Sequence, residues 1–316
     1  MGQDQCVCVK PCQVMDEPEQ GKCDQGLLAV AIRDYPVFRL LFTVDISVEC
    51  TVYSNGLRRI WEMRRFLSLG DTMNLRHMGG YQTRHGAKTR ADKLYRSGFL
   101  NISGDDQIAL FEELGISTIY DFRSPMERGK NDLQVGGRTE VVELGMLVAS
   151  VENLWDMLMA EGLAPKGAEK IMRERYRELT REEIPGYRAM FEHMMANEGG
   201  ILVMCSFGKD KAGIASALLL SALEVDEAYV VEDYLLSSNA YADKNAAIGK
   251  FQHFFNSEGL PVDESIVLPI LDARLDYLDT AWQVMKEKSG SRDNFMLEEL
   301  GIDQAAREHL KQRFTH

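Results

Sequence analysis

The chain has few cysteines, and their positions exclude a disulfide-stabilised secreted fold. It has six in 316 residues. Five of them lie before residue 51: Cys6, Cys8, Cys12, Cys23 and Cys50. A small secreted fold would distribute paired cysteines along its whole length. The Cys-x-Cys-x3-Cys spacing near the start, with no histidine close by, is also a poor zinc signal, so we expect no metal and no other cofactor.

Long apolar runs are also missing. The most apolar early stretch, residues 27–52, is interrupted by charged residues, so it is not a membrane span. The first residues are polar and acidic, which does not resemble a secretory signal peptide. Together with the cysteine pattern, this predicts a cytoplasmic protein.

The chain lacks an excess of positive charge. It carries 36 Lys and Arg against 49 Asp and Glu, a net charge of −13. This disfavours nucleic acid as a partner and leaves no polybasic patch for a membrane surface. One membrane route stays open, because Gly2 is a candidate for myristoylation and Cys6 or Cys8 for palmitoylation. A plain disordered tail is the simpler interpretation.

The most informative segment is residues 201–225. Four apolar residues, 201–204, lead into Cys205; a short polar loop then closes at Gly213, and residues 214–223 are almost entirely apolar. This pattern predicts a buried strand, a tight turn and a buried helix, with the cysteine at the carboxyl end of the strand.

A thiol at Cys205 would face the amino end of the predicted helix and the backbone N–H groups of residues 206–211. Such N–H groups form a cradle for phosphate and favour a thiolate, so we expect Cys205 to have a low pKa. A thiolate nucleophile and an anion cradle in one loop are what thiol-dependent phosphoryl transfer requires. The alternative is a buried core cysteine, which is common in proteins.

The loop resembles the signature His-Cys-x-x-Gly-Lys-Asp-Arg-Thr-Gly of the tyrosine-phosphatase-like family, which includes bacterial and fungal protein tyrosine and phosphoinositide phosphatases. Four more segments resemble family motifs in the same order: residues 74–81, 94–98, 115–124 with Glu127, and 233–239. Each short match is weak alone, but the ordered set is specific. It implies an α/β fold: a parallel-sheet cysteine-phosphatase fold with helices on both faces and a helical lid insertion.

The resemblance also implies a domain organisation. Residues 61–316 would form the phosphatase-like catalytic domain, and residues 1–60 an N-terminal extension that need not be ordered. Helical periodicity is expected in several segments, namely residues 151–159, 170–179, 185–195 and 226–255. Residues 269–314 read as two amphipathic helices broken near Ser289 and Gly290.

By resemblance, Cys205 is the nucleophile and Asp210 the general acid, which we expect to be kept protonated near the operating pH. Lys211 stands at the position of the family arginine, and Lys209 would contact phosphate oxygen, as in loops that act on phosphoinositides. The predicted phosphate-binding set is Ser206, Phe207, Gly208, Lys209, Ala212 and Gly213.

Three loop positions depart from the family signature. Met204 replaces histidine, Lys211 replaces arginine and Ala212 replaces threonine. A guanidinium holds two phosphoryl oxygens at once and an ammonium does not. By analogy with oxyanion-hole deletions, the loss costs about 2–4 kcal/mol of barrier. Phosphate binding should therefore survive better than turnover.

Asp121 and Arg123 follow an apolar strand predicted over residues 116–120. They could be a surface pair beside a helix that starts with Ser124 as N-cap and Pro125 as first residue. They could instead lie at the ligand-binding edge of the sheet, supporting the loop or touching substrate. The resemblance favours the second interpretation.

The sequence thus predicts a phosphoric monoester hydrolase that acts through a phosphocysteine on Cys205. Its partner would be a phosphorylated protein, phosphotyrosine above all, or a phosphoinositide. The alternative is a pseudophosphatase that binds phosphorylated ligands with little turnover, because Lys211 replaces the arginine.

Overall fold

The computed structural model describes residues 65–129, 133, 135, 138–146, 157–158, 164–240, 244–257 and 262–316. The predicted extension over residues 1–60, with Gly2, Cys6 and Cys8, lies outside these residues, as does most of the helix expected over 151–159. The domain boundary therefore stays a prediction. Within the described ranges, no helix is long and apolar enough to cross a membrane.

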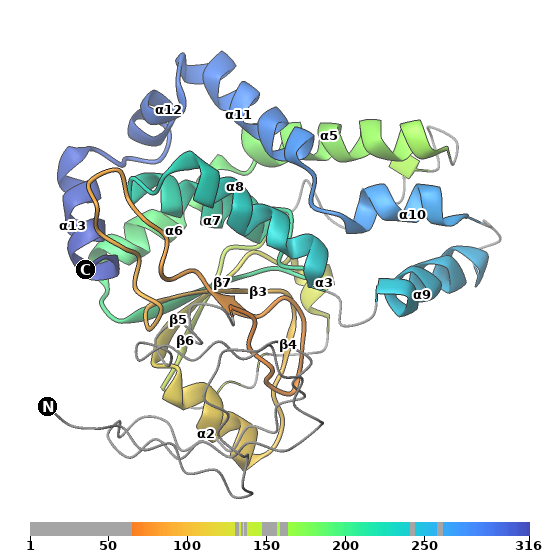
Figure 1. Cartoon of the computed structure of the whole chain (residues 1–316), viewed down its shortest axis with the longest axis horizontal. Coiled ribbons are helices and arrows are strands. Elements are labelled where there is room, and N and C mark those ends of the chain that lie inside the picture. The colour runs from red at the N-terminus through yellow and green to blue at the C-terminus, as the bar shows by residue number, and fades with distance from the viewer. Residues whose placement is uncertain are drawn as a thin grey trace, which may run out of the picture. The chain divides into compact units, whose positions relative to one another are not determined.

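A five-stranded sheet forms the centre of the described fold (Figure 1). In spatial order its strands are β2 (Arg76–His77), β3 (Leu94–Ser97), β7 (Gly200–Met204), β5 (Ile116–Asp121) and β6 (Glu140–Glu143). β3, β7, β5 and β6 are mutually parallel, whereas β2 pairs antiparallel with β3 at the edge. A separate antiparallel pair joins β1 (Asp71–Thr72) to β4 (Leu100–Asn101).

The remaining elements are helices. They are α2 (Asp105–Glu113), α3 (Pro125–Arg128), α5 (Pro165–Arg181), α6 (Ile184–Ala196), α7 (Lys211–Ala222), α8 (Glu227–Leu235), the 3₁₀ helix η1 (Leu236–Asn239), α9 (Lys244–Ser257), α10 (Glu264–Leu271), α11 (Leu275–Ser289), α12 (Arg292–Glu298) and α13 (Gln304–Phe314). The predicted α/β class with a mainly parallel sheet is confirmed, with β2 as an antiparallel addition.

The sheet has a core on each face, because successive strand residues point to opposite sides. Ile201 and Val203 of β7 join the larger core, to which helices α5 to α8 and α11 to α13 contribute. Leu202 and Met204 join a smaller core with Phe111 of α2. Strands buried on both faces read as continuous apolar runs, which is why residues 201–204 carry no alternation.

Helix α7 is buried along its whole length. It begins at Lys211, three residues before the predicted apolar run, so Gly213 lies inside the helix and does not close the loop. A Cβ on Gly213 would stand 3.2 Å from the Tyr234 ring of α8, so the glycine lets α7 and α8 approach closely.

A third apolar cluster is separate from both faces of the sheet. It joins α5, α9 and α10 through residues such as Ile171, Ile248 and Val267. In Figure 1 these helices extend to one side of the sheet. α5 and α9 overlap helices predicted over residues 170–179 and 226–255, whereas α10 begins outside any predicted helix. We refer to these three helices together as the helical insertion.

The carboxyl-terminal prediction of two helices is wrong. Pro269 lies inside α10, and α11, α12 and α13 follow it. Gly290 ends α11 with a left-handed φ of 80°, as predicted for a break there, but Gly301 with φ of 71° adds a second break between α12 and α13.

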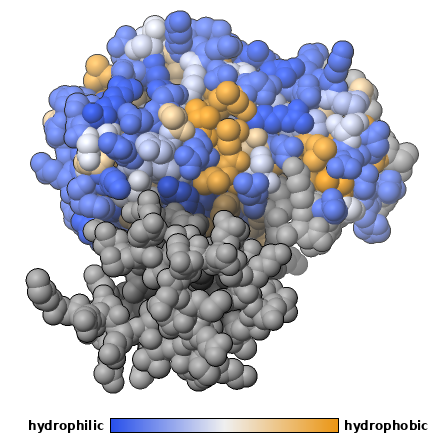
Figure 2. All heavy atoms as spheres, viewed as in Figure 1, coloured by the Kyte–Doolittle hydropathy of each residue, from blue (hydrophilic) through white to orange (hydrophobic). Residues whose placement is uncertain are grey.

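Most large apolar side chains of the described part lie in these cores. The exceptions are Phe66, Met126, Leu275 and Leu297, which are exposed. On the face seen in Figure 2, the surface is mainly hydrophilic, with a narrow apolar strip near its middle.

Candidate active site

Cys205 follows β7 directly, and α7 begins six residues later. Its side chain is buried, with the residue 4% exposed, and its sulfur accepts a hydrogen bond from the N–H of Ala212. The loop therefore turns back so that the first turn of α7 faces the sulfur. The strand, turn and helix predicted around Cys205 are confirmed as local structure.

Gly208 allows this loop to pack on the turn after β3. Its φ is 66°, and a Cβ there would lie 2.5 Å from the nitrogen of Gly98 and the carbonyl oxygen of Ser97. No other residue meets both requirements without moving the backbone. The N–H of Phe99 also donates to the carbonyl oxygen of Ser206 at 3.0 Å.

Two loop carbonyls point at side chains behind the loop. Asn74 Nδ2 donates to the carbonyl oxygens of Phe207 at 3.1 Å and Gly208 at 3.0 Å, and Arg96 Nη2 donates to Gly208 at 2.6 Å. In a trans peptide the N–H points opposite to the preceding C=O. The N–H groups of Gly208 and Lys209 therefore point away from Asn74 and Arg96, as an anion cradle requires.

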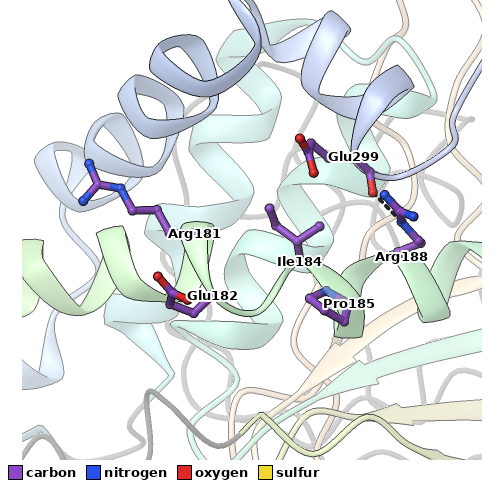
Figure 3. Close-up of a pocket in the computed structure, with 6 residues that line it drawn as sticks. All are labelled: Arg181, Glu182, Ile184, Pro185, Arg188 and Glu299. Carbon is purple, nitrogen blue, oxygen red and sulfur yellow. Dashed lines mark hydrogen bonds between the residues drawn. The ribbon is translucent and has the colours of Figure 1, made fainter.

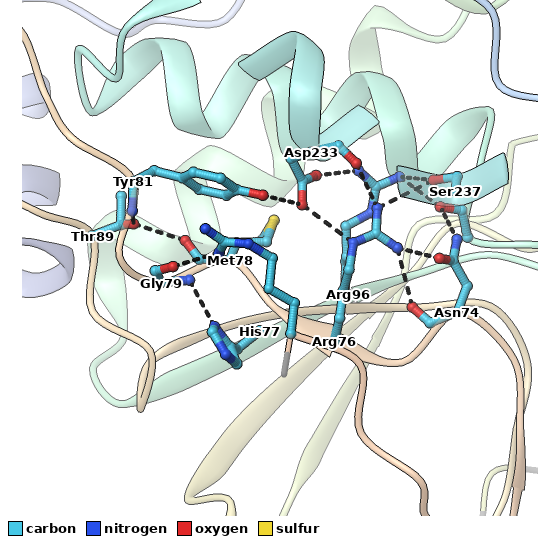
Figure 4. A network of polar contacts seen from close by, with 12 residues as sticks. Asn74, Arg76, His77, Met78, Gly79, Tyr81, Thr89, Arg96, Asp233 and Ser237 are labelled. Carbon is cyan, nitrogen blue, oxygen red and sulfur yellow. Dashed lines mark hydrogen bonds and ion pairs between the residues drawn. The ribbon is translucent and has the colours of Figure 1, made fainter. Parts of the chain in front are cut away.

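The donors behind the loop belong to a buried ionic network (Figure 4). Asp233 of α8 accepts from Arg76 Nε at 3.2 Å, Arg96 Nη1 at 2.5 Å and the Tyr81 hydroxyl at 3.2 Å. Ser237 accepts from both guanidiniums. Burial alone would raise the pKa of Asp233, but Arg76 and Arg96 outweigh it and bring the pKa to about 2.

This network gives a role to three sequence segments that resembled family motifs without an assigned function. Residues 74–81, 94–98 and 233–239 supply its members, and they meet behind residues 207 and 208. Buried arginines need partners. The sequence signal for this network was Arg76 and Arg96 beside apolar residues, with Asp233 later in the chain as a possible partner. The sequence-based prediction did not use it.

Lys211 is held by Glu127 of α3. Its Nζ lies 2.5 Å from Glu127 Oε2 and 3.5 Å from the Met146 carbonyl oxygen, and the residue is 1% exposed. Ser206 Oγ donates to Glu127 Oε1 at 3.0 Å. Burial opposes ionisation of Glu127, but Lys211 and the hydrogen bonds from Ser124 and Ser206 lower its pKa. A carboxylate thus partners the cation that replaces the family arginine.

Glu127 is also part of the helix start predicted at Ser124 and Pro125. Ser124 Oγ accepts from the N–H of Glu127 at 3.1 Å, and the N–H of Ser124 donates to Glu127 Oε2 at 2.7 Å. This reciprocal capping box confirms the N-cap prediction. One carboxylate therefore fixes both α3 and Lys211, a link that the sequence did not reveal.

Asp121 and Arg123 are paired with each other at the carboxyl edge of the sheet. Arg123 Nη2 lies 2.8 Å from Asp121 Oδ2, and the N–H of Arg123 donates to Oδ1 at 3.0 Å. Asp121 stands opposite Met204, the residue before Cys205. Both residues are buried, so the interpretation as a surface pair is wrong.

Asp210 is enclosed by charged and polar groups. Tyr176 OH donates to its Oδ1 at 2.9 Å, Lys209 Nζ lies 3.3 Å from the same oxygen, and Arg175 Nε lies 3.6 Å from Oδ2. Burial would raise its pKa, but Lys209, Arg175 and the Tyr176 hydroxyl together lower the pKa below its ordinary value. These partners favour the ionised carboxylate, whereas the sequence predicted a protonated one.

Lys209 reaches the helical insertion. Its Nζ donates to the carbonyl oxygen of Ile270 at the end of α10, and lies 3.4 Å from that of Asp272. Burial lowers the pKa of Lys209. The lysine expected at the phosphate thus has carbonyl partners from a neighbouring element.

The thiol prediction also needs correction. Burial raises the pKa of Cys205 above its ordinary value of 9.0, although the N–H of Ala212 and the charge of Lys211 oppose this. Asp210 and Glu127 add to the rise. The prediction of a low pKa considered the helix end and the lysines but not the full burial of the sulfur or the Glu127 carboxylate.

Comparisons with known proteins identify the family of the chain. The model of the tyrosine phosphatase family matches residues 67–316. The chain belongs to this family. A protein of Cupriavidus necator that is named as a tyrosine-protein phosphatase is 30% identical over 250 residues, which cover 77% of this chain and 86% of that protein. The triple specificity protein phosphatase PtpB of Mycobacterium tuberculosis is 27% identical over 244 residues, 68% of this chain and 88% of its own length.

Membership of the tyrosine phosphatase family makes the chain a phosphatase by class, a hydrolase that acts on phosphorylated substrates. Among the described residues, no cluster of three or more His, Cys, Asp or Glu side chains has the geometry to hold a metal ion.

One cavity of about 390 Å³ lies away from the loop, at the junction of α5 and α6 and the end of α12 (Figure 3). Its lining residues are Arg181, Glu182, Ile184, Pro185, Arg188 and Glu299. Arg188 Nε donates across it to the carbonyl oxygen of Glu299 at 2.6 Å. No predicted site residue lines this cavity.

Proposed function

We propose that this phosphatase hydrolyses phosphotyrosine and related aryl phosphates through a phosphocysteine on Cys205. One observation carries the proposal. The Phe207 and Gly208 carbonyls face Asn74 and Arg96, so the N–H groups of the next residues point away from these side chains, to the side where an anion would bind. The N–H of Ala212 donates to the Cys205 sulfur. Such a loop stabilises an anion next to the nucleophile.

In the first step the Cys205 thiol, whose pKa is raised by burial, loses its proton to solvent, and the resulting thiolate attacks phosphorus. A phosphorus–sulfur bond forms, and the phosphorus–oxygen bond to the leaving group breaks with its electron pair on oxygen. In the second step water attacks the phosphocysteine, and its proton passes to Asp210. The electron pair of the broken phosphorus–sulfur bond returns to Cys205. Asp210 then releases its proton to solvent, which protonates the departed oxygen, and this completes the cycle.

The charge state of Asp210 supports aryl substrates. An ionised Asp210 can accept a proton from water but cannot protonate a leaving oxygen. A tyrosine phenolate, with a conjugate pKa of about 10, leaves without help far more readily than the alkoxide of an inositol or serine. Lys209, bound to the end of α10, has its ammonium engaged and not turned to a second substrate phosphate.

The pseudophosphatase alternative has one observation in its favour, the Lys211–Glu127 ion pair. It neutralises the charge that would stabilise the transition state. Both relatives described above are named as phosphatases, which supports the enzyme.

The test compares wild type with Cys205→Ser and Asp210→Asn on an aryl and an alkyl phosphate. We expect wild type to hydrolyse the aryl ester, with a phosphate adduct in intact-mass spectra that Cys205→Ser abolishes. Since Ala212 supplies no hydroxyl to the departing thiolate, adduct breakdown should be slow and a phenolate burst should precede turnover. Asp210→Asn should keep the burst and slow turnover further.

Other results would redirect the proposal. Faster hydrolysis of the alkyl ester or of a phosphoinositide would overturn the aryl preference. Phosphate binding without any adduct or turnover would establish the pseudophosphatase.

A further inference from the structure

Tyr187 of α6 carries a buried hydroxyl that the fold does not use. The side chain is 0% exposed, and its OH has no hydrogen-bond partner within the described part of the chain. A buried hydroxyl without a partner is destabilising, and natural folds rarely keep one without a function. The neighbouring buried phenols of Tyr176 and Tyr234, in contrast, bond to each other at 2.6 Å.

The Tyr187 ring lies beside the strand ends that present Cys205. It packs on Phe122 with ring centroids 5.6 Å apart. The N–H of Phe122 donates to the carbonyl oxygen of Met204 at 2.9 Å, directly before Cys205. Tyr187 and Cys205 also belong to the same core cluster.

Four titratable groups act on the Tyr187 hydroxyl. Glu183, at the start of α6, acts most strongly, and the other three, Cys205, Asp210 and Arg175, belong to the site. Burial, followed by the three acidic groups, raises the pKa of Tyr187 well above its ordinary value. The phenol therefore keeps its proton through the working pH range and can act as a donor.

The loop itself is short of side-chain donors. Lys211 is paired with Glu127, Ser206 donates to the same carboxylate, and Ala212 has no hydroxyl. A phosphoryl group on Cys205 would bring oxygens outward from the sulfur, towards the groups that surround it. We infer that the Tyr187 hydroxyl donates a hydrogen bond to a phosphoryl oxygen of the substrate bound at Cys205.

This inference rests on the proposed function, but it makes a separate claim about one atom. The test is Tyr187→Phe, which removes only the hydroxyl. We expect the dissociation constant for inorganic phosphate, measured from the phosphate-dependent rise in melting temperature, to increase about 10- to 100-fold. The kcat/KM for an aryl phosphate should fall by a similar factor. Without phosphate, the melting temperature should stay the same or rise, because an unsatisfied polar group has been removed.

Tyr95→Phe is the matched control. Tyr95 is also buried, but its hydroxyl donates to the carbonyl oxygen of Leu114 at 3.2 Å in the smaller core. Its loss should lower the melting temperature and leave phosphate affinity unchanged. This pattern is the reverse of that expected for Tyr187→Phe.

Two results would overturn the inference. One is a Tyr187→Phe variant with wild-type phosphate affinity and wild-type kcat/KM. The other is a lower phosphate-free melting temperature with no kinetic change, which would show that the hydroxyl has a structural partner. If wild type binds phosphate but hydrolyses nothing, the proposed function fails, and the phosphate affinity of Tyr187→Phe still decides the role of Tyr187.

Discussion

The Arg96 guanidinium donates a 2.6 Å hydrogen bond to the carbonyl oxygen of Gly208. A positively charged donor therefore polarises the peptide whose N–H, on Lys209, points the other way. Two arginines and one aspartate leave a net positive charge behind the loop, and because all three side chains are buried, solvent screens this charge little. In the proposed function, these buried residues behind the loop would help to stabilise an anion at Cys205.

Asp233→Asn should be strongly destabilising. It would leave two buried guanidiniums with a weaker partner, which costs about 3–5 kcal/mol of unfolding free energy. Urea denaturation measures the change. Asp293→Asn is the control, because Asp293 is 72% exposed and its pair with Arg307 should contribute less than about 1 kcal/mol. Equal losses in the two variants would contradict the role given to the network.

Asp233 should also make stability depend on acid pH. Its folded-state pKa of about 2 lies below the ordinary 3.8, so the ionised form favours the folded state. This contribution, about 2 kcal/mol, is present above pH 4 and is lost as pH falls from about 4 to 2. Melting temperatures over this range should fall more steeply in wild type than in Asp233→Asn. Parallel curves would argue against the prediction.

Gly208→Ala should prevent formation of the loop. The new Cβ would lie 2.5 Å from backbone atoms of Ser97 and Gly98, and alanine would also have to adopt an unfavourable positive φ. Gly86→Ala separates the two effects, because Gly86 has φ of 85° but nothing within 4 Å. We expect Gly86→Ala to cost about 1 kcal/mol and retain phosphate binding. Gly208→Ala should lose phosphate binding in the same thermal-shift measurement, and retention of binding would show that the loop can move.

The sequence predicted those features that depend on neighbouring residues. The apolar runs identified β5 and β7, Ser124 and Pro125 identified the start of α3, and Pro185 identified the start of α6. The order of the family motifs identified the fold and the position of Cys205.

The electrostatics of the site could not be predicted in this way. Lys211 and Glu127 are 84 residues apart, and Lys209 and Ile270 are 61 apart. The direction of each pKa change depends on which of these groups meet and how deeply they are buried. The sequence predicted a low thiol pKa and a protonated Asp210. Burial instead raises the pKa of Cys205, and Lys209, together with Arg175 and Tyr176 of α5, lowers the pKa of Asp210.

Lys211→Arg should increase kcat about tenfold on an aryl phosphate, with a smaller effect on KM. An arginine can keep one N–H on Glu127 and direct others to two phosphoryl oxygens, and this matters most in the transition state. Lys311→Arg, in a remote pair with Glu224, is the control and should change neither constant. An unchanged or lower kcat in Lys211→Arg would mean that the loop is adapted to lysine.

Glu127→Gln should lower the pKa of Cys205. The carboxylate raises that pKa directly and pairs with the lysine that would lower it, whereas glutamine still fits the capping box. The rate of iodoacetamide labelling, measured across pH, should rise several-fold at pH 7, while wild type should still be gaining rate above pH 9. Glu224→Gln serves as the control. A wild-type labelling profile in Glu127→Gln would exclude this account of the thiol.

The Arg76–Arg96–Asp233 network also has a consequence for biosynthesis. Its arginines leave the ribosome long before Asp233, and the loop around Cys205 lies between the arginines and Asp233 in the chain. Until α8 is synthesised and packs in place, Arg96, which donates to the Gly208 carbonyl oxygen, lacks the carboxylate of Asp233 that balances its charge. The loop around Cys205 therefore has no stable conformation before that point. Affinity for phosphate should therefore arise late, when most of the chain is complete, and a truncated product that ends before residue 233 would not compete for phosphorylated ligands.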